Sequence, residues 1–238
     1  MMAEKAELAA RKPQNKFLET CLAWGTFISI FLALFLGLVY APTERTMGDI
    51  QRIFYFHVAS AWLGLFAFIV VFVASILYLK TKNSKWDIYA YTSAEIGVFF
   101  TTIVLVTGPI WAHPIWHTWW TWDPRLTTTL ILWFLYVAYG RIRSSLGEEE
   151  KRARFAAVFG IIAFADVPIV FFAIRWWRTM HPAPVVTANG IALASGMLPA
   201  FFVSLFAFTL LYLYFMLRSV RIERMRADIK AIKENALG

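Results

Sequence analysis

Hydrophobic residues along this chain gather into six long runs, separated by short polar or charged segments. The corresponding predicted helices cover residues 21–40, 53–79, 88–109, 124–142, 155–175 and 196–217. A membrane-spanning helix needs roughly 18 or more apolar residues in a row, and most of the runs reach that length. The fourth is shorter, but Asp123 followed by Pro124 marks a helix start, because Asp is a favoured N-cap and Pro is favoured at the first helical position. The pattern predicts an all-α integral membrane protein, with six transmembrane helices in a single domain over residues 1–238.

The composition favours the same class of protein. Hydrophobic residues make up 60% of the chain and charged residues 16%, whereas a soluble domain has about 45–50% and about 25%. The first run follows several lysines and arginines, as in a signal peptide, but it is as long as a full span, and Tyr40-Ala41-Pro42 does not fit a cleavage site. We therefore expect a retained first helix. The single cysteine, Cys21, cannot form an internal disulfide.

The positive charges indicate the orientation. Most of the 23 lysines and arginines lie in the N-terminal tail, in loops 80–87 and 141–154, and in the C-terminal tail 218–238. Because Lys and Arg concentrate on the cytoplasmic side of membrane proteins, we expect both termini in the cytoplasm and the C-terminal tail as a short basic helix on the inner surface. The net charge of +8 then serves contact with anionic membrane lipid and does not indicate nucleic-acid binding.

A tryptophan-rich segment, residues 109–126, falls on the predicted outer face. Five of the eleven tryptophans lie within twelve positions: Trp111, Trp116, Trp119, Trp120 and Trp122. Enrichment of Trp at a membrane interface explains two or three of them, but not five. Gly108, Pro109, Pro114 and Pro124 are expected to break helix geometry, so we predict an irregular outer platform. Its aromatic surface would suit a flat, hydrophobic macrocycle.

Two histidines also lie at predicted outer ends of spans. His57 is in FYFHVASAW, and His181 is in RWWRTMHPAP. Each has an ordinary alternative: His57 is satisfied by a neighbouring hydroxyl or backbone group, and His181 belongs to an interfacial aromatic belt. However, ionisable residues inside membrane segments are costly and often functional. Two outward histidines from separate spans, beside aromatic surfaces, are able to supply both axial ligands of one haem iron.

Charged residues near these histidines fit the same ligand. Arg125 falls in the first turn of the fourth helix, where the helix dipole disfavours a cation. A carboxylate ligand such as a haem propionate would resolve this conflict. Arg52, at the outer edge of the second span, is a second candidate, and the alternative for both is contact with lipid head groups.

Other polar residues leave several interpretations open. His113 and His117 have an HxxxH spacing, but Pro114 between them and the lack of cysteine partners argue against a zinc site. Glu95 and Asp166 lie inside apolar runs, where they would serve a proton relay, a subunit contact or an internal hydrogen bond. We favour the internal hydrogen bond for both.

The motifs together resemble a known family. WHTWWTWDPRLT is similar to the WWD signature of haem-handling proteins in c-type cytochrome maturation, and FHVASAW, WWRTMHP and the six spans resemble the CcmC family over residues 17–217. The resemblance implies haem b bound at the outer face of the bacterial plasma (inner) membrane, with His57 and His181 as axial ligands. It assigns the WWD motif to Trp116, Trp119, Trp120, Trp122 and Asp123.

The resemblance also implies partners. Similar proteins present haem to the periplasmic chaperone CcmE and work with the ABC-type subunits CcmA and CcmB and with the small protein CcmD. We therefore expect an assembly factor that is not itself an enzyme, with ATP hydrolysis in a partner subunit. The alternatives are a haem-translocating channel and a cytochrome b-like electron-transfer subunit. No polar stripe indicates a channel, and no histidine lies in a cytoplasmic segment.

Overall fold

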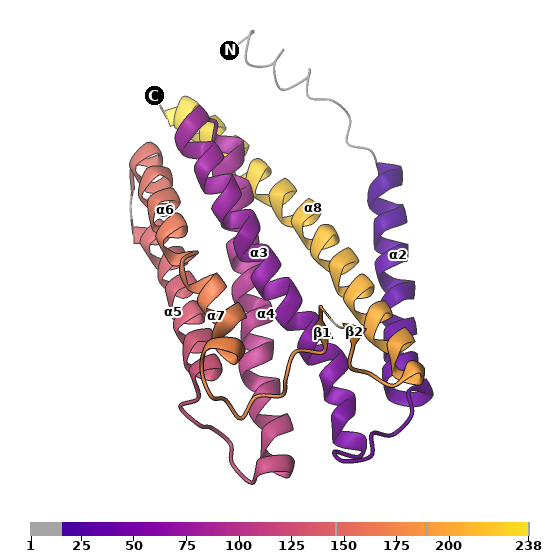
Figure 1. The fold of residues 1–238 in the computed structure, drawn as a ribbon. Coiled ribbons are helices and arrows are strands. Elements are labelled where there is room, and N and C mark those ends of the chain that lie inside the picture. Colours follow the sequence, from indigo (N-terminus) through magenta and orange to yellow (C-terminus); the bar gives the residue numbers. More distant parts are fainter. Residues whose placement is uncertain (1–15, 146, 189, 238) are drawn as a thin grey trace.

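The computed structural model describes residues 16–145, 147–188 and 190–237, most of which are helical. The long helices are α2 (Lys16–Phe35), α3 (Ile53–Thr81), α4 (Ser84–Trp116), α5 (Pro124–Ser145), α6 (Glu149–Ala163), α7 (Asp166–Trp176) and α8 (Leu198–Leu237). The short elements are the π-helical turn η1 (Leu36–Tyr40), the 3-10 turns η2 (Asp49–Arg52) and η3 (Ser195–Met197), and the strands β1 (Val186–Thr187) and β2 (Gly190–Ile191). In Figure 1 the helices form one bundle with α3 and α4 at its centre, α2 and α8 on one side, and α5, α6 and α7 on the other.

Five helical segments of the described chain are long and apolar enough to cross a membrane. They are Lys16–Tyr40, Asp49–Thr81, Ser84–Trp116, Glu149–Trp176 and Ser195–Ile229. This agrees with the predicted all-α membrane fold. Helix α5 is not among the five, but it packs against α4, α6 and α7 inside the same bundle. A sixth crossing by α5 therefore stays a prediction.

Helix α4 continues beyond its predicted end at residue 109. It runs to Trp116 and contains both Pro109 and Pro114, so the prediction that these prolines break the helix was wrong. A proline removes one backbone donor, but a helix inside a bundle tolerates this because its neighbours supply other contacts. The irregular part of the tryptophan-rich segment is limited to residues 117–123.

The predicted fifth helix is divided in two. Helix α6 ends at Ala163 and α7 begins at Asp166. Pro168 accounts for the break, because its ring would clash with the carbonyl of Phe164 four residues earlier in a continuous helix. The expected internal hydrogen bond of Asp166 is incomplete, since its Oδ2 is buried without a hydrogen-bond partner among the described residues.

The C-terminal tail is not a separate surface helix. Helix α8 runs without interruption from the last apolar span into the basic tail, which corrects the prediction for residues 218–238. The start of α2 and the end of α8 lie at the same end of the bundle (Figure 1). Segments 41–52 and 117–123 lie at the opposite end, which we call the loop end. That the loop end faces outward remains a prediction from the charge distribution.

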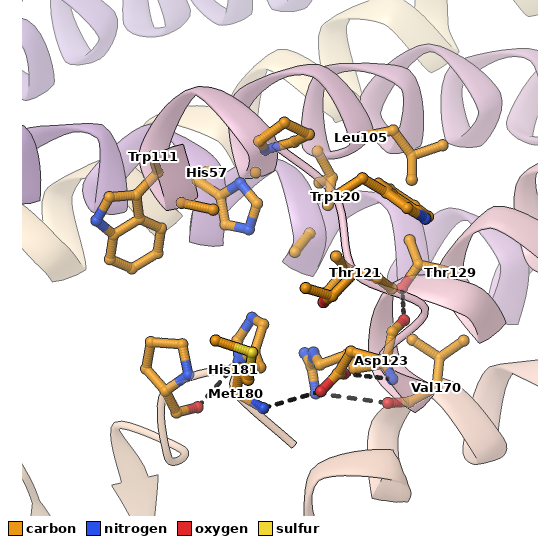
Figure 2. A pocket seen from close by; sticks show the side chains of 18 of the residues that line it. His57, Leu105, Trp111, Trp120, Thr121, Asp123, Thr129, Val170, Met180 and His181 are labelled. Atoms are coloured by element: carbon orange, nitrogen blue, oxygen red, sulfur yellow. Dashed lines mark hydrogen bonds between the residues drawn. The ribbon is translucent and has the colours of Figure 1, made fainter. Parts of the chain in front are cut away.

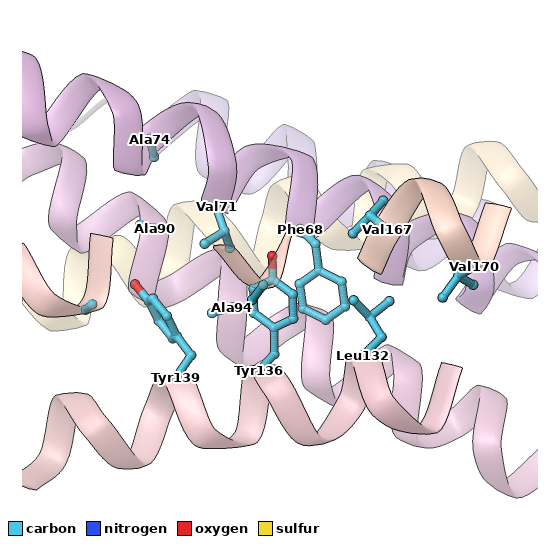
Figure 3. Packing of buried hydrophobic residues seen from close by; sticks show 12 residues of the cluster. Phe68, Val71, Ala74, Ala90, Ala94, Leu132, Tyr136, Tyr139, Val167 and Val170 are labelled. Atoms are coloured by element: carbon cyan, nitrogen blue, oxygen red, sulfur yellow. The ribbon is translucent and has the colours of Figure 1, made fainter. Parts of the chain in front are cut away.

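Close packing between α3 and α4 holds the centre of the bundle. A Cβ atom on Gly97 would lie 2.4 Å from the Phe68 ring, so only glycine allows this approach. Phe68 in turn stacks on Tyr136 of α5, with 3.6 Å between ring centroids (Figure 3). Small residues such as Ala94 complete this core cluster. The cluster also includes residues of α6 and α7, so it joins five helices at mid-bundle.

A buried ion pair joins α4 and α5 in the half of the bundle away from the loop end. Arg143 donates hydrogen bonds to both carboxylate oxygens of Asp87, with 2.7 Å between Nη2 and Oδ2. Both residues are buried, and the guanidinium also lies over the ring of Tyr91, 4.5 Å from its centroid. A bidentate pair of this kind compensates both charges away from water.

Replacing Asp87 alone should destabilise the protein more than replacing the pair. We expect Asp87→Ala to lower the free energy of unfolding by about 3–5 kcal/mol, because Arg143 would remain as an uncompensated buried charge. The double variant Asp87→Leu with Arg143→Met should lose much less, since no buried charge remains. Titration of the purified protein with SDS, followed by circular dichroism, measures the difference.

The exposed pair of Glu148 and Lys151 provides a control. The Nζ of Lys151 is 2.6 Å from Oε2 of Glu148, but both side chains are mostly exposed. Glu148→Gln should therefore change the free energy of unfolding very little. Equal losses in the single and double variants would show that the ion pair does not hold α4 against α5.

Candidate functional site

A cavity opens at the loop end of the bundle. It encloses about 1180 Å³, including the part that is open to the outside. Helices α3, α4, α5 and α7 form its walls, together with segment 117–123 and residues 180–182 (Figure 2). Most of the lining is apolar, and the polar groups are few. Such a cavity suits a largely hydrophobic ligand that a small number of polar contacts orient.

His57 lies in the second turn of α3 and borders this cavity. Its Nδ1 is 2.8 Å from the Oγ1 of Thr107 on α4. The Thr107 hydroxyl already donates its single proton to the carbonyl of Ile103 at 2.7 Å, so it accepts from Nδ1–H of His57. This bond fixes the tautomer and leaves Nε2 with a free lone pair. The ring of Trp111 packs edge-on against the imidazole, 5.7 Å away.

His181 lies on the opposite side of the same cavity (Figure 2). Its Nδ1 is 2.9 Å from the carbonyl of Pro182, and a carbonyl only accepts, so Nδ1 carries the proton and Nε2 is free. Burial, and secondarily the positive charge of Arg125, lower the pKa of His181 to about 4. The imidazole is therefore neutral at physiological pH, as a metal ligand must be.

Asp123 connects the two walls of the cavity. Its Oδ1 accepts from the backbone N–H of Arg125 at 2.9 Å and so caps α5, which confirms the predicted N-cap. Its Oδ2 accepts from the backbone N–H of Met180 at 2.9 Å. Asp123 is buried, and Met180 directly precedes His181. One carboxylate therefore fixes both the start of α5 and the segment that carries His181.

Arg125 carries a positive charge at the start of α5, in the electrostatic field of the Asp123 carboxylate. Its guanidinium borders the cavity and donates a long hydrogen bond of 3.4 Å to the carbonyl of Val170 on α7. Within the described part of the chain, no ion pair involves this residue. A partly buried guanidinium at the positive end of a helix favours an anionic ligand.

The tryptophans of the segment divide between the cavity and the surface. Four line the cavity: Trp111, Trp116, Trp119 and Trp120. Trp122 does not line it, and 76% of its surface is exposed; it contacts Trp120 edge-on at 5.9 Å. The segment therefore supplies both a lining and an exposed aromatic rim.

Arg52 was expected at the site but lies elsewhere. Its Nη1 donates to the carbonyls of Gly37 and Ala41 at 3.1 Å each, and its Nε donates to Asp49. It is not among the residues that line the cavity. Carbonyls at the end of a helical segment need donors, and Arg52 provides one for Gly37 within η1 and one for Ala41, which directly follows it.

The other two histidines also lie outside the cavity lining. His113 stacks on Trp119, with ring centroids 4.1 Å apart, and His117 ends α4 in a left-handed conformation with φ 53°. Among the described residues, no group of three or more His, Cys, Asp and Glu side chains is placed to hold a metal ion. His113 thus orients an aromatic wall of the cavity.

Sequence reasoning missed Thr107 and Met180. Thr107 fixes the tautomer of His57 from another helix, and its only signal in the sequence is a hydroxyl within an apolar run. Met180 lines the cavity and offers its backbone to Asp123. No local pattern indicates that contact, because 57 residues separate the two positions.

Comparison with known proteins gives the family. The model of the family described as Heme exporter protein C, CcmC, matches residues 6–235. The chain belongs to the CcmC family. It is 33% identical to Heme exporter protein C of Bradyrhizobium diazoefficiens over 89% of this chain and 81% of the relative. It is 30% identical to Heme exporter protein C of Haemophilus influenzae over 92% of both chains.

The CcmC family also has mitochondrial members among the relatives. A putative cytochrome c biosynthesis CcmC-like mitochondrial protein of Marchantia polymorpha is 35% identical over 80% of this chain and 82% of the relative. The predicted family membership is thus confirmed over nearly the whole chain.

In this CcmC-family chain, loss of the Asp123 carboxylate should free the segment that carries His181. We expect Asp123→Ala to accelerate amide hydrogen exchange at Met180 and to loosen the first turn of α5, since an N-cap contributes about 1 kcal/mol. Asp123→Asn should have a smaller effect because its amide oxygen still accepts one bond. Exchange measured by mass spectrometry in lipid nanodiscs tests this.

The control for this experiment is Asp49→Ala. Asp49 is an exposed carboxylate that bonds Arg52 and Thr43 in another segment of the loop end, so exchange at Met180 should stay unchanged in this variant. Unaltered exchange at Met180 in Asp123→Ala would rule out the carboxylate as the contact that holds His181.

Proposed function

We propose that this protein binds haem b in the cavity at the loop end, through His57 and His181 as axial ligands. The observation that carries the proposal is the pair of imidazoles on opposite sides of one cavity. In each, a hydrogen bond from Nδ1 leaves the Nε2 lone pair free. Two such nitrogens are the donor set of a six-coordinate haem iron.

The rest of the lining supports the same ligand. The indoles of Trp111, Trp116, Trp119 and Trp120 offer flat apolar area, which favours a planar macrocycle. Arg125 supplies the positive charge that a propionate would neutralise. Once bound, haem would supply an iron centre, while this chain would hold, orient and shield it.

The protein would hold haem in order to pass it on. Its relatives are named for haem export and cytochrome c biosynthesis, so we assign this chain to the haem-handling step of c-type cytochrome maturation. The exposed rim at Trp119 and Trp122 is suited to meet the chaperone CcmE on the outer face of the bacterial inner membrane. CcmA and CcmB would supply ATP hydrolysis, and CcmD would complete the complex. The protein itself would then act by positioning and not as an enzyme.

The positions of the histidines favour holding haem over carrying electrons across the membrane. All four lie in the half of the bundle toward the loop end, on the first turns of α3, the last turns of α4 and the segment after α7. On the side of the cavity away from the loop end, the core cluster around Phe68 and Tyr136 fills the space between the helices. This packing also argues against an open channel through this chain alone.

Removing the two proposed ligands tests the coordination. The double variant His57→Ala with His181→Ala should lose bound haem and its Soret band, and each single variant should give a weaker, five-coordinate spectrum that added imidazole shifts back. His117→Asn is the matched control, because His117 lies outside the lining and Asn tolerates its left-handed conformation at the end of α4, so this variant should keep the wild-type spectrum. An unchanged spectrum in the double variant would reject axial ligation by these residues.

Arg125 should bind a carboxylate of the ligand. We expect Arg125→Gln to weaken haem binding by roughly 10-fold or more, since hydrogen bonds to charged groups contribute about 1.5–3 kcal/mol. Haem dimethyl ester, which has no carboxylates, should bind the wild type and Arg125→Gln equally well. Titration of the Soret absorbance measures both affinities.

Arg52→Gln separates this effect from a general loss of positive charge. Because Arg52 bonds backbone carbonyls away from the cavity, its variant should keep the wild-type affinity for haem. A preference for haem over its ester that survives in Arg125→Gln would exclude Arg125 as the propionate partner.

A further inference from the structure

Glu95 is a carboxylic acid on the outside of the bundle. It lies at the start of the fourth turn of α4, and its side chain is exposed. The residues that follow it on the same face are also exposed: Phe99, Thr102, Val106 and Ile110. Their spacing of three and four residues places them in one stripe along α4, which we call the α4 stripe. Glu95 is its only charged member.

The depth of Glu95 makes this exposure costly. Eleven residues separate it from the start of α4 at Ser84, which corresponds to about 16 Å along the helix. Near that start, Lys85 lies over the ring of Trp86 at 4.8 Å, a combination typical of the membrane interface. With the interface at Lys85 and Trp86, the predicted orientation places Glu95 against the apolar part of the membrane, where an ionisable side chain needs a partner.

The bundle provides the Glu95 carboxylate with a hydrogen bond but with no ion pair among the described residues. The hydroxyl of Tyr91 donates to Oε1 of Glu95 at 2.7 Å. The guanidinium of Arg143 lies over the ring of Tyr91, but Asp87 already compensates its charge through two hydrogen bonds. In the described chain, no ion pair involves Glu95. Among the residues that the structure describes, Glu95 therefore has a hydrogen bond but no cationic partner.

We propose that the α4 stripe docks a membrane-spanning helix of another polypeptide that presents a lysine or arginine to Glu95. A cation on an apolar helix is the complement of one acid in an apolar stripe, because pairing compensates two charges that are each costly in lipid. Phe99, Val106 and Ile110 then supply the packing surface. A second copy of this chain, joined through the same stripe about a two-fold axis, would bring two Glu95 side chains together, and like charges repel.

Photo-crosslinking in native membranes tests this interface. A benzophenone amino acid replaces Phe99, one turn from Glu95, in the full-length protein, and the irradiated adduct is digested and sequenced by mass spectrometry. We expect an adduct with a membrane-spanning segment that contains Lys or Arg. Glu95→Gln, which still accepts the hydrogen bond from Tyr91, should lower the adduct yield at least tenfold. Changing that Lys or Arg to Glu, combined with Glu95→Lys, should restore the yield.

Controls separate the docking from general effects. The same crosslinker at Phe31, an exposed residue of α2 on the other side of the bundle, should give products that do not depend on Glu95. Adducts with lipid only, with a second copy of this chain, or in a yield that Glu95→Gln leaves unchanged would each overturn the proposal. Haem absorbance should be the same in Glu95→Gln and the wild type, so this result is independent of the haem proposal.

Discussion

The geometry of the cavity depends on the two hydrogen bonds that Asp123 accepts. One ties it to the backbone of Arg125, and the other ties it to the backbone of Met180. Without the second bond, the chain between α7 and β1 would have few fixed contacts near His181, because that segment has no helix or long strand of its own. The carboxylate therefore converts a loop into a defined wall. This gives the acid of the WWD motif a structural reason that does not require contact with the ligand.

The two imidazoles adopt the same tautomer, but different hydrogen-bond acceptors fix it. His57 is held by a side chain, Thr107, whose own proton is committed to a helix carbonyl. His181 is held by the backbone carbonyl of Pro182 next to it. In both cases Nδ1 keeps the proton and Nε2 stays free, so neither ring needs to change tautomer before it binds a metal. The histidine on a helix is fixed by another helix, while the histidine on a loop is fixed locally and by the Asp123 bond nearby.

Local sequence signals predicted the helices better than the ends of helices. The apolar runs, the cap at Asp123 and the identity of the family were readable because each depends on residues close together in the chain. The course of α4 through Pro109 and Pro114 was not, since its stability comes from packing in the bundle. For the site, residue type and predicted side of the membrane selected His57, His181 and Arg125 as candidates, and the structure brings all three to one cavity. The same reasoning also selected Arg52, which lies outside the lining of this cavity because its contacts depend on how η1 ends.

The charged side chains of this bundle fall into two groups, those that are paired within the bundle and those that are not. Arg143 is matched by Asp87, and Arg52 is matched by carbonyls and Asp49, so neither requires another molecule. Arg125 and Glu95 have no such match in the described chain. An ion in an apolar environment is costly until it is paired. Binding of an opposite charge to Arg125 or to Glu95 is therefore favourable. Arg125 lies in the cavity wall and favours a small anion inside the bundle. Glu95 lies on the outer surface of α4 and favours a cation carried by another helix.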